Sequence, residues 1–173
     1  GKNTLWKNLQ ILELQNNSIK SEGVVALAKN ITWTNLRSLN LDWNASGPEG
    51  AKVLSQNPAW TRLQHLRLQS NAIGIQGAVE LSKNTTWTHL HTLNLHSNSI
   101  GVEGVTSLSG NTAWVSLQKL NLAFNAIWDE GIEELSKNTS WVDLRELDLK
   151  KTSVYSFEKL QNPNWPSQLV INK

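Results

Sequence analysis

The sequence predicts an α/β fold: a right-handed solenoid, or horseshoe, with a parallel β-sheet on the concave side and helices on the convex side. Three observations predict it. Leucines recur every 27 residues, a tryptophan recurs with the same period, and each unit joins an alternating apolar stretch to a stretch with helical spacing. A chain with this pattern stacks one supersecondary unit on the next, so that each unit packs only against its neighbours.

Three leucine columns define the strand of each unit, because alternation places leucines on one face and the intervening residues on the other. The first column is Leu9, Leu36, Leu63, Leu90, Leu117 and Leu144. The second is Leu12, Leu39, Leu66, Leu93, Leu120 and Leu147. The third is Leu14, Leu41, Leu68, Leu95, Leu122 and Leu149. No insertion interrupts the first five units, so the strands should pair in one register.

The segment after each strand should form the crossover helix that parallel strands require. In each of these segments two apolar residues three apart share one helix face, which should pack on the leucines. The pairs are Val24 and Leu27, Ala51 and Leu54, Ala78 and Leu81, Val105 and Leu108, and Ile132 and Leu135. Ser55 and Lys83 should lie on the outer side of their helices. A glycine near each helix start should let the helix approach the sheet closely.

Two asparagine columns flank the helices. The first asparagine column is Asn17, Asn44, Asn71, Asn98 and Asn125, and Thr152 replaces it in the sixth unit. We expect a ladder here, because an amide side chain can bond the unpaired backbone groups of a buried turn. The second asparagine column is Asn3, Asn30, Asn57, Asn84, Asn111, Asn138 and Asn162. It follows the helices and should end them in a left-handed conformation.

Six of the nine tryptophans form a further column. The tryptophan column is Trp6, Trp33, Trp60, Trp87, Trp114 and Trp141. A binding residue has no reason to recur in phase in every unit, so we interpret this column as an aromatic wall between helix and strand. Its indole nitrogens should find backbone acceptors or solvent at the edge.

The ends of the chain depart from the repeat. Residues 1–8 match the tail of a preceding repeat, residues 9–143 hold five 27-residue repeats, and residues 144–173 hold a shortened sixth repeat and a C-terminal cap. The apolar triplet 169–171 should form a short closing strand. Solenoids need polar caps at both ends, and residues 1–8 do not resemble one. Together with the missing initiator methionine, this predicts one domain that is part of a longer protein.

The unit LxxLxLxxNxIGxEG, followed by a helical stretch, resembles the leucine-rich repeat family and its ribonuclease-inhibitor-like subclass. The resemblance covers the whole chain, although members of that subclass commonly have leucine at the tryptophan column. Such proteins bind and block enzymes or act as sensors, and similar in-phase repeats occur in effectors that intracellular bacteria deliver into host cells. The resemblance therefore implies a protein-binding module. The even repeats and the absence of cysteine favour a bacterial origin.

The composition limits the classes of partner and indicates the cellular compartment. The chain has 16 basic and 14 acidic residues, a balance that does not indicate a nucleic-acid or membrane partner. It has no apolar run of about 18 residues, so no membrane helix is expected. It has no cysteine, which excludes disulfides and suits the cytoplasm, or the host cytosol for a delivered effector.

Positions that vary between repeats should carry the function, because the scaffold does not require them. Trp43 and Phe124 are large apolar groups beside the first asparagine column, on an otherwise polar rim. They are either interface anchors or loop aromatics folded back onto a neighbour. Trp128 and Tyr155 could extend such a patch, although shielding of the C-terminal end is favoured. The predicted partner-binding set on the concave face is Trp43, Phe124, Arg67, His96, Asp42, Glu13, His65, Asp148 and Lys150.

Other kinds of site find little support. All four histidines lie between residues 65 and 96, but no carboxylate or thiolate recurs with them at metal-ligand spacing. No nucleophile elbow, phosphate loop or helical HExxH occurs, so we expect neither an enzyme nor a cofactor. Nucleic-acid or glycan binding on the concave face is the alternative to protein binding. Acidic residues among the basic ones argue against it. A structural spacer within a larger protein is the third reading.

Overall fold

The computed structural model describes residues 6–173, which form alternating strands and helices. Within these residues the strands are β1 (Ile11–Glu13), β2 (Ser38–Asn40), β3 (His65–Arg67), β4 (Thr92–Asn94), β5 (Lys119–Asn121), β6 (Glu146–Asp148) and β7 (Val170–Asn172). The helices are α1 (Lys20–Ala28), α2 (Gly47–Ser55), α3 (Gly74–Ser82), α4 (Gly101–Ser109), α5 (Trp128–Leu135) and the 3-10 helix η1 (Phe157–Lys159).

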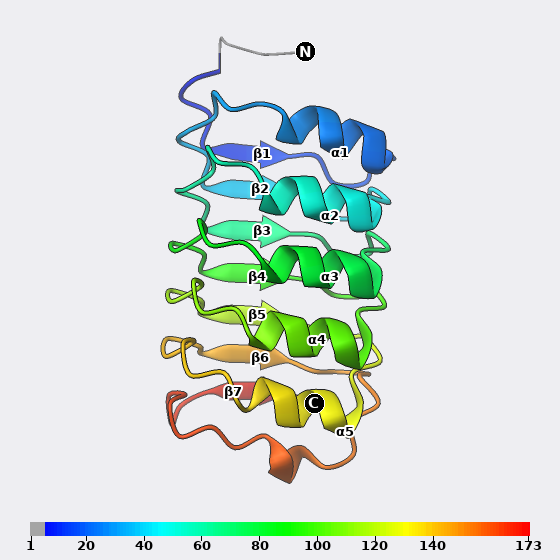
Figure 1. Ribbon diagram of the computed structural model, residues 1–173, viewed down its shortest axis with the longest axis vertical. Helices are drawn as coiled ribbons and strands as arrows, with labels where there is room; N and C mark the ends of the chain where they lie inside the picture. The colour runs from blue at the N-terminus through cyan, green and yellow to red at the C-terminus, as the bar shows by residue number, and fades with distance from the viewer. Residues whose placement is uncertain (1–5) are drawn as a thin grey trace.

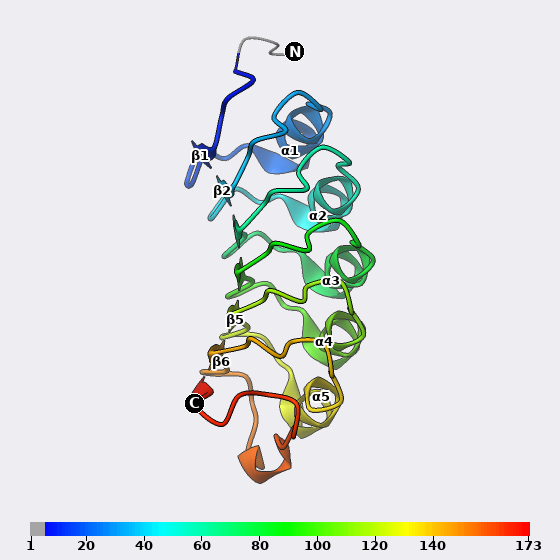
Figure 2. The same cartoon turned by 90° about the vertical axis from the view of Figure 1, so that its left-hand side faces the viewer.

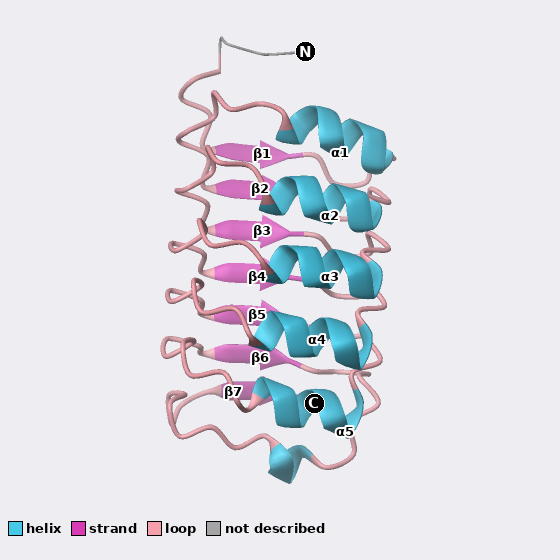
Figure 3. Cartoon of the chain, viewed as in Figure 1, coloured by secondary structure: helices cyan, strands magenta, loops and turns pink. Residues whose placement is uncertain are grey.

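The elements form two layers. Figure 1 shows α1 to α5 stacked in front of the strands, and each turn runs from strand to helix to the next strand in the sense of a right-handed coil. Turning the molecule by 90° places the strands along one side and the helices along the other (Figure 2). The alternation of helix and strand along the stack is clear in Figure 3. The predicted α/β solenoid, with a parallel sheet on one side and helices on the other, is therefore confirmed.

The seven described strands form one parallel sheet in the order of the sequence. The register follows the 27-residue period: Leu12 pairs with Leu39, Leu39 with Leu66, and so on to Leu120 with Leu147. The last strand breaks the period, because Leu147 pairs with Ile171 after a shortened unit. The expected closing strand therefore forms, displaced by one residue toward the C-terminus.

Leucines and helix residues meet in one core between the layers. From the second repeat on, both members of each predicted helix pair are buried, as with Ala78 and Leu81. In the first repeat Val24 is buried but Leu27 is only partly so, because within residues 6–173 no helix covers it from the other side. Ser55, expected on the outer side of α2, is also buried, and its hydroxyl donates to the Lys52 carbonyl over 2.7 Å.

The tryptophan column lies in this core. Trp60, Trp87, Trp114 and Trp141 are fully buried, whereas Trp6 at the open end of the stack is 52% exposed. The rings of Trp114 and Trp141 lie nearly parallel, with centroids 6.4 Å apart. The prediction of an aromatic wall is confirmed within the described residues.

The expectation that the indole nitrogens find backbone acceptors or solvent at the edge was wrong. The buried Nε1 atoms of the column from Trp33 to Trp141 have no hydrogen-bond acceptor in the protein, and neither has Trp165. Carbonyls at the helix ends already accept bonds from the second asparagine column, such as the Ser55 carbonyl from Asn84. Apolar packing alone therefore holds these rings, at the expense of unmade hydrogen bonds.

The first asparagine column forms the expected ladder. The Oδ1 atom of Asn98 accepts the backbone N–H groups of Asn71 and Ile73 at 3.0 and 3.3 Å. Its Nδ2 donates to the carbonyls of Leu68 and His96 at 2.7 and 3.1 Å. Each buried asparagine thus ties its own turn to the preceding one.

The second asparagine column differs from its prediction. None of its buried members has a positive φ, and the helices end in right-handed residues. Instead the side chains form another ladder: Asn84 donates to the Ser55 carbonyl at 2.7 Å and accepts the N–H groups of Thr86 and Trp87. The amide satisfies the turn directly, so the backbone does not need a left-handed residue there. Asn3 lies outside the described residues.

From α2 on, the glycine near the helix start permits close contact between neighbouring helices rather than between helix and sheet. A Cβ atom on Gly77 would lie 3.1 Å from the Ala51 Cβ and 3.1 Å from the Pro48 Cα, both in the preceding helix. It would also lie 2.4 Å from the Ile73 side chain. The column therefore sets the spacing of the helix layer.

The two ends of the stack are covered differently. At the N-terminal end the side chains of Leu9, Leu12 and Leu14 are only partly buried, and a hollow of about 320 Å³ opens beside Leu27 and Trp33. At the other end β7 pairs with β6, and η1 packs against α5. The N-terminal end of the stack thus exposes more of its apolar interior than the opposite end.

We expect the backbone amides of β1 to exchange with solvent faster than those of β4, because among the described strands β1 pairs with β2 alone. Hydrogen exchange of the monomeric chain, followed by mass spectrometry of its peptides, measures this difference. Equal protection of β1 and β4 in a monomer would contradict the expectation.

Candidate functional site

The outward side chains of the sheet and the residues just after each strand form the candidate site. In β3 the central residue is buried and its two neighbours are exposed, as alternation requires. The sheet therefore offers one row from the first residue of every strand and another row from the third. The chain then turns, and the residue just before each ladder asparagine lies on the rim of the face.

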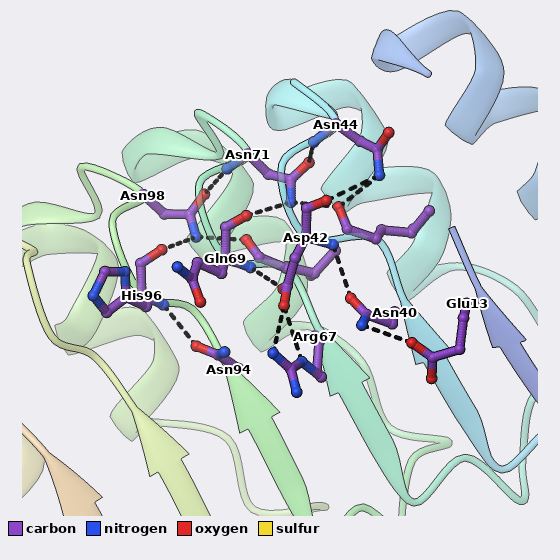
Figure 4. Close-up of polar contacts among 12 residues, drawn as sticks. Glu13, Asn40, Asp42, Asn44, Arg67, Gln69, Asn71, Asn94, His96 and Asn98 are labelled. Atoms are coloured by element: carbon purple, nitrogen blue, oxygen red, sulfur yellow. Dashed lines mark hydrogen bonds and ion pairs between the residues drawn. The ribbon is translucent and has the colours of Figure 1, made fainter. Parts of the chain in front are cut away.

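A polar network fixes the turn after the strands (Figure 4). In several repeats the third strand residue caps the backbone N–H two positions later. Asn40 caps Asp42 at 3.0 Å, Asn94 caps His96 at 3.1 Å, and Asn121 caps residue 123 at 3.0 Å. Because these oxygens are used within the fold, the amide nitrogens are the atoms that remain for other contacts. That of Asn40 donates to the Glu13 carboxylate at 2.7 Å.

In the third repeat a pair of charged residues provides the cap for the corresponding backbone N–H. Arg67 stands where other repeats have asparagine, and its side chain has no acceptor atom. Asp42 in the preceding repeat supplies it instead: its Oδ1 accepts the Gln69 N–H at 2.7 Å. Its Oδ2 accepts from Nε and Nη2 of Arg67 at 2.9 and 2.8 Å, as Figure 4 shows.

This arrangement changes the predicted partner-binding set. Asp42 is only 3% exposed and both its carboxylate oxygens are bonded, so it serves the fold and has no surface for a partner. Arg67 remains exposed and keeps free donors on its guanidinium, held in place by Asp42. Asp42 therefore acts as a positioning residue for Arg67.

Trp43 and Phe124 are exposed on the rim, 57% and 53% respectively. Both adopt left-handed backbone conformations, with φ of +61° and +56°. The same turn recurs in the other repeats with Asn16, Ser70, Ser97 and Lys151, which also have positive φ. The left-handed conformation costs about 1–2 kcal/mol for residues with a Cβ atom, so the turn itself is strained in every repeat, and the scaffold does not require a bulky side chain there.

The two aromatics differ in their surroundings. The Phe124 ring packs on the His96 ring with centroids 4.8 Å apart, so it leans partly onto the neighbouring repeat. One nitrogen of that imidazole, Nδ1, is buried and has no hydrogen-bond partner in the protein. Phe124 therefore agrees in part with the alternative that the rim aromatics fold back onto a neighbour. Trp43 is exposed to a similar extent, but among the described residues no aromatic ring packs on it.

Trp128 and Tyr155 do not shield the C-terminal end as expected. Tyr155 is 80% exposed, and Trp128 is nearly half exposed with a φ of +59°. The loop is held by its backbone instead: the N–H groups of Tyr155 and Ser156 donate to Oδ1 of Asp129 at 2.8 and 3.0 Å. These two bonds are the main reason that the pKa of Asp129 is lowered.

The middle of the face carries a histidine pair. The rings of His65 and His91 meet edge to face with centroids 6.1 Å apart, and His65 Nδ1 lies 3.1 Å from the Thr92 hydroxyl. Partial burial lowers the pKa of His65, and the charge of His91 lowers it further. Among the described residues, no group of three or more histidine or carboxylate side chains could hold a metal ion.

Toward the C-terminal end the face has a shallow hollow of about 190 Å³. Its polar lining is Thr92, Asn94, Lys119, Asn121, Glu146 and Asp148. Lys119 and Glu146 form an ion pair across it at 2.8 Å. Of the predicted set only Asp148 lines this hollow, with Lys150 exposed just beyond. The other polar residues of the hollow were not predicted. They occupy variable columns of the sequence, and this variation is the signal that could have indicated them.

Comparison with protein families gives one match and one negative result. The leucine-rich repeat family matches residues 7–28, 34–55, 61–82, 88–109 and 115–136. These five segments cover more than half of the chain and keep its 27-residue spacing. A search of curated proteins finds no match. Within the described residues, none of the helices has the length and apolar character that crossing a membrane would need.

Proposed function

The chain belongs to the leucine-rich repeat family, and from this premise we propose that it binds a partner protein through its concave face and the rim beside it. Repeats of this family generally mediate protein–protein interaction and are typically not enzymes. The observation that carries the proposal is the pair of exposed aromatics, Trp43 and Phe124, in left-handed backbone conformations.

These aromatics are hard to explain as scaffold. The fold forms the same left-handed turn with asparagine, serine or lysine in the other repeats, so it does not require a large aromatic side chain there, and neither ring fills the core. Exposed tryptophan is also among the residues that contribute most to protein interfaces. Trp43 and Phe124 stand three repeats apart, roughly 14–15 Å at the usual strand spacing, which one partner surface can span.

The proposal extends to the kind of protein. The 27-residue unit supports the ribonuclease-inhibitor-like subclass, in which a concave face blocks an enzyme. The even, cysteine-free repeats support a bacterial effector that acts in the cytosol of a host. Affinity capture with the full-length protein, repeated with this chain, identifies the partner. Recovery of the same protein from both places its contact within these repeats.

Replacing Trp43 by asparagine should weaken partner binding by about 2 kcal/mol or more, because it removes an interface anchor. The same change should leave the fold as stable or stabilise it by up to about 1 kcal/mol, since asparagine tolerates the left-handed conformation. Asn16 occupies this position in the first repeat with a φ of +59°. Calorimetric titration with the captured partner and thermal melting measure the two effects.

The matched control lies on the opposite layer. Lys83 is exposed at the end of α3 and pairs only with Glu80 within its own helix, so Lys83→Ala should leave partner binding unchanged. If Lys83→Ala abolishes binding and Trp43→Asn does not, the partner binds the helix layer and the proposal is wrong.

A further inference from the structure

Positive charge is concentrated on the sheet side of the second, third and fourth repeats. The residues between the helices there, 34–46, 61–73 and 88–100, include three arginines and all four histidines. Asp42 is their one carboxylate, and Arg67 neutralises it. The corresponding residues 142–154 of the sixth repeat carry three acidic and three basic side chains and balance. The middle of the face is therefore basic, while its C-terminal end carries both acidic and basic side chains in equal number.

The basic groups lie beside one another along the edge where the strands begin. We call Arg37, Arg62, His65, His89 and His91 the basic strip. The Arg62 guanidinium is held at 2.7 Å by the Asn35 side chain of the preceding repeat. His89 Nδ1 lies 3.2 Å from the backbone carbonyl of Thr61, which precedes Arg62 in the chain, so His89 lies against the repeat that carries Arg62. With the exception of half-buried His91, every member is exposed.

We propose that the basic strip docks an acidic segment of the partner protein, and that this docking tightens as the pH falls. The inference rests on the proposed function and adds the chemistry of the partner. Charge complementarity selects the occupant: the strip offers two arginines and three imidazoles, with no carboxylate among them. Three neighbouring strands span only about 10 Å, so a few carboxylates on a short segment match the strip.

The pH dependence follows from the surroundings of His65. The strand residues beside it, Ser38 on β2 and Thr92 on β4, are uncharged. Arg67 on its own strand is engaged by Asp42, and Lys119, one strand beyond Thr92, pairs with Glu146. The remaining charge that faces the ring is His91.

Burial and His91 both disfavour the charged form of His65, which is why its pKa lies below the usual value. A carboxylate from the partner would favour the charged form and raise that pKa, so binding would take up a proton. Affinity must then increase as the pH falls, by up to about tenfold per pH unit for each proton taken up. The gain should appear between about pH 7.5 and 5.5, where histidines titrate.

Fluorescence anisotropy with a labelled oligo-glutamate peptide tests the proposal at low ionic strength. We expect binding that tightens severalfold from about pH 7.5 to 5.5, and no binding of oligo-lysine. The double variant His65→Gln, His91→Gln should bind like the original chain at the higher pH and lose most of the gain at the lower pH, since only His89 remains of the three imidazoles. Arg37→Gln with Arg62→Gln should weaken binding at both.

The charge-matched control is Lys83→Gln with Lys137→Gln, two lysines at helix ends that pair only within their own helices. It should change neither affinity nor pH dependence, and melting curves of all variants should show that they are folded. The proposal is overturned if this control weakens binding as much as the arginine variant, or if the histidine variant keeps the full pH dependence. Tighter binding of a random single-stranded oligonucleotide than of oligo-glutamate would also overturn it, and would assign the strip to nucleic acid.

The captured partner separates this proposal from the proposed function. If Trp43→Asn weakens partner binding but salt and pH do not change the affinity, the concave face is the binding site. The proposal that the partner docks an acidic segment there is then wrong. If neither the rim variant nor the strip variants affect the partner, both proposals fail.

Discussion

Replacing Trp87 by alanine should lower the free energy of unfolding by about 3–5 kcal/mol. The side chain is fully buried in the middle of the tryptophan column, with a copy of itself in the repeat on either side. Truncation removes apolar contacts from both interfaces and leaves a cavity that neighbouring indoles cannot fill by turning. Urea unfolding followed by circular dichroism measures the loss.

Trp6→Ala is the matched control, since Trp6 occupies the same repeat position but exposes about half of its surface. Its loss should be about 1 kcal/mol or less, because little area leaves the core. Comparable losses at both positions would show that burial in the column does not determine the effect.

Asn98→Ala should destabilise the chain by about 3–5 kcal/mol, although it removes only one small side chain. Asn98 makes four hydrogen bonds to the backbone, two as acceptor and two as donor, at a fully buried site. Without it, N–H and carbonyl groups of two repeats remain buried without partners, and each costs about 1–3 kcal/mol before relaxation. The same unfolding measurement applies.

Asn17→Ala tests the reason for that loss. Asn17 has the same repeat position, but it is exposed and donates only to the carbonyls of Leu14 and Gln15. Water can replace those bonds, so the loss should be about 1 kcal/mol or less. An Asn17→Ala variant as unstable as Asn98→Ala would mean that local turn preference, rather than buried hydrogen bonding, gives the asparagine column its role.

The order of elements and the strand register could be predicted because residues at the same repeat position have the same environment in every unit. A leucine that returns every 27 residues has one explanation, which is a strand face buried in every unit. Buried tryptophans and the first asparagine ladder follow from the same logic. The period identifies which residues share an environment, and residue type identifies the environment.

Contact direction could not be predicted, because periodicity says nothing about which neighbour a group meets. Gly77 approaches the preceding helix and not the sheet. Asn84 satisfies a turn through its side chain, so the left-handed residues occur in the strand-to-helix turns instead. The buried indole nitrogens lack acceptors, and this could not be predicted because the sequence shows the donor but not whether an acceptor lies within its reach.

The candidate site was recognisable only in part. Trp43 stands out in the sequence because it breaks a column, and the structure adds that its backbone is left-handed. Asp42 looked equally variable, but it varies because Arg67 in the next repeat cannot cap its own turn. Two departures from the repeat thus compensate for each other, and one sequence cannot separate such compensation from function.

The constant 27-residue spacing has a consequence for how such a chain can change in length. Because strand pairing, both asparagine ladders and helix contacts link each residue to its counterpart one repeat away, any internal repeat presents the same surfaces above and below. Recombination between two copies that adds or removes one whole unit therefore joins compatible interfaces, wherever in the unit the crossover falls. Duplication can enlarge the recognition surface without a new folding problem, and point mutation can then diversify each added strand.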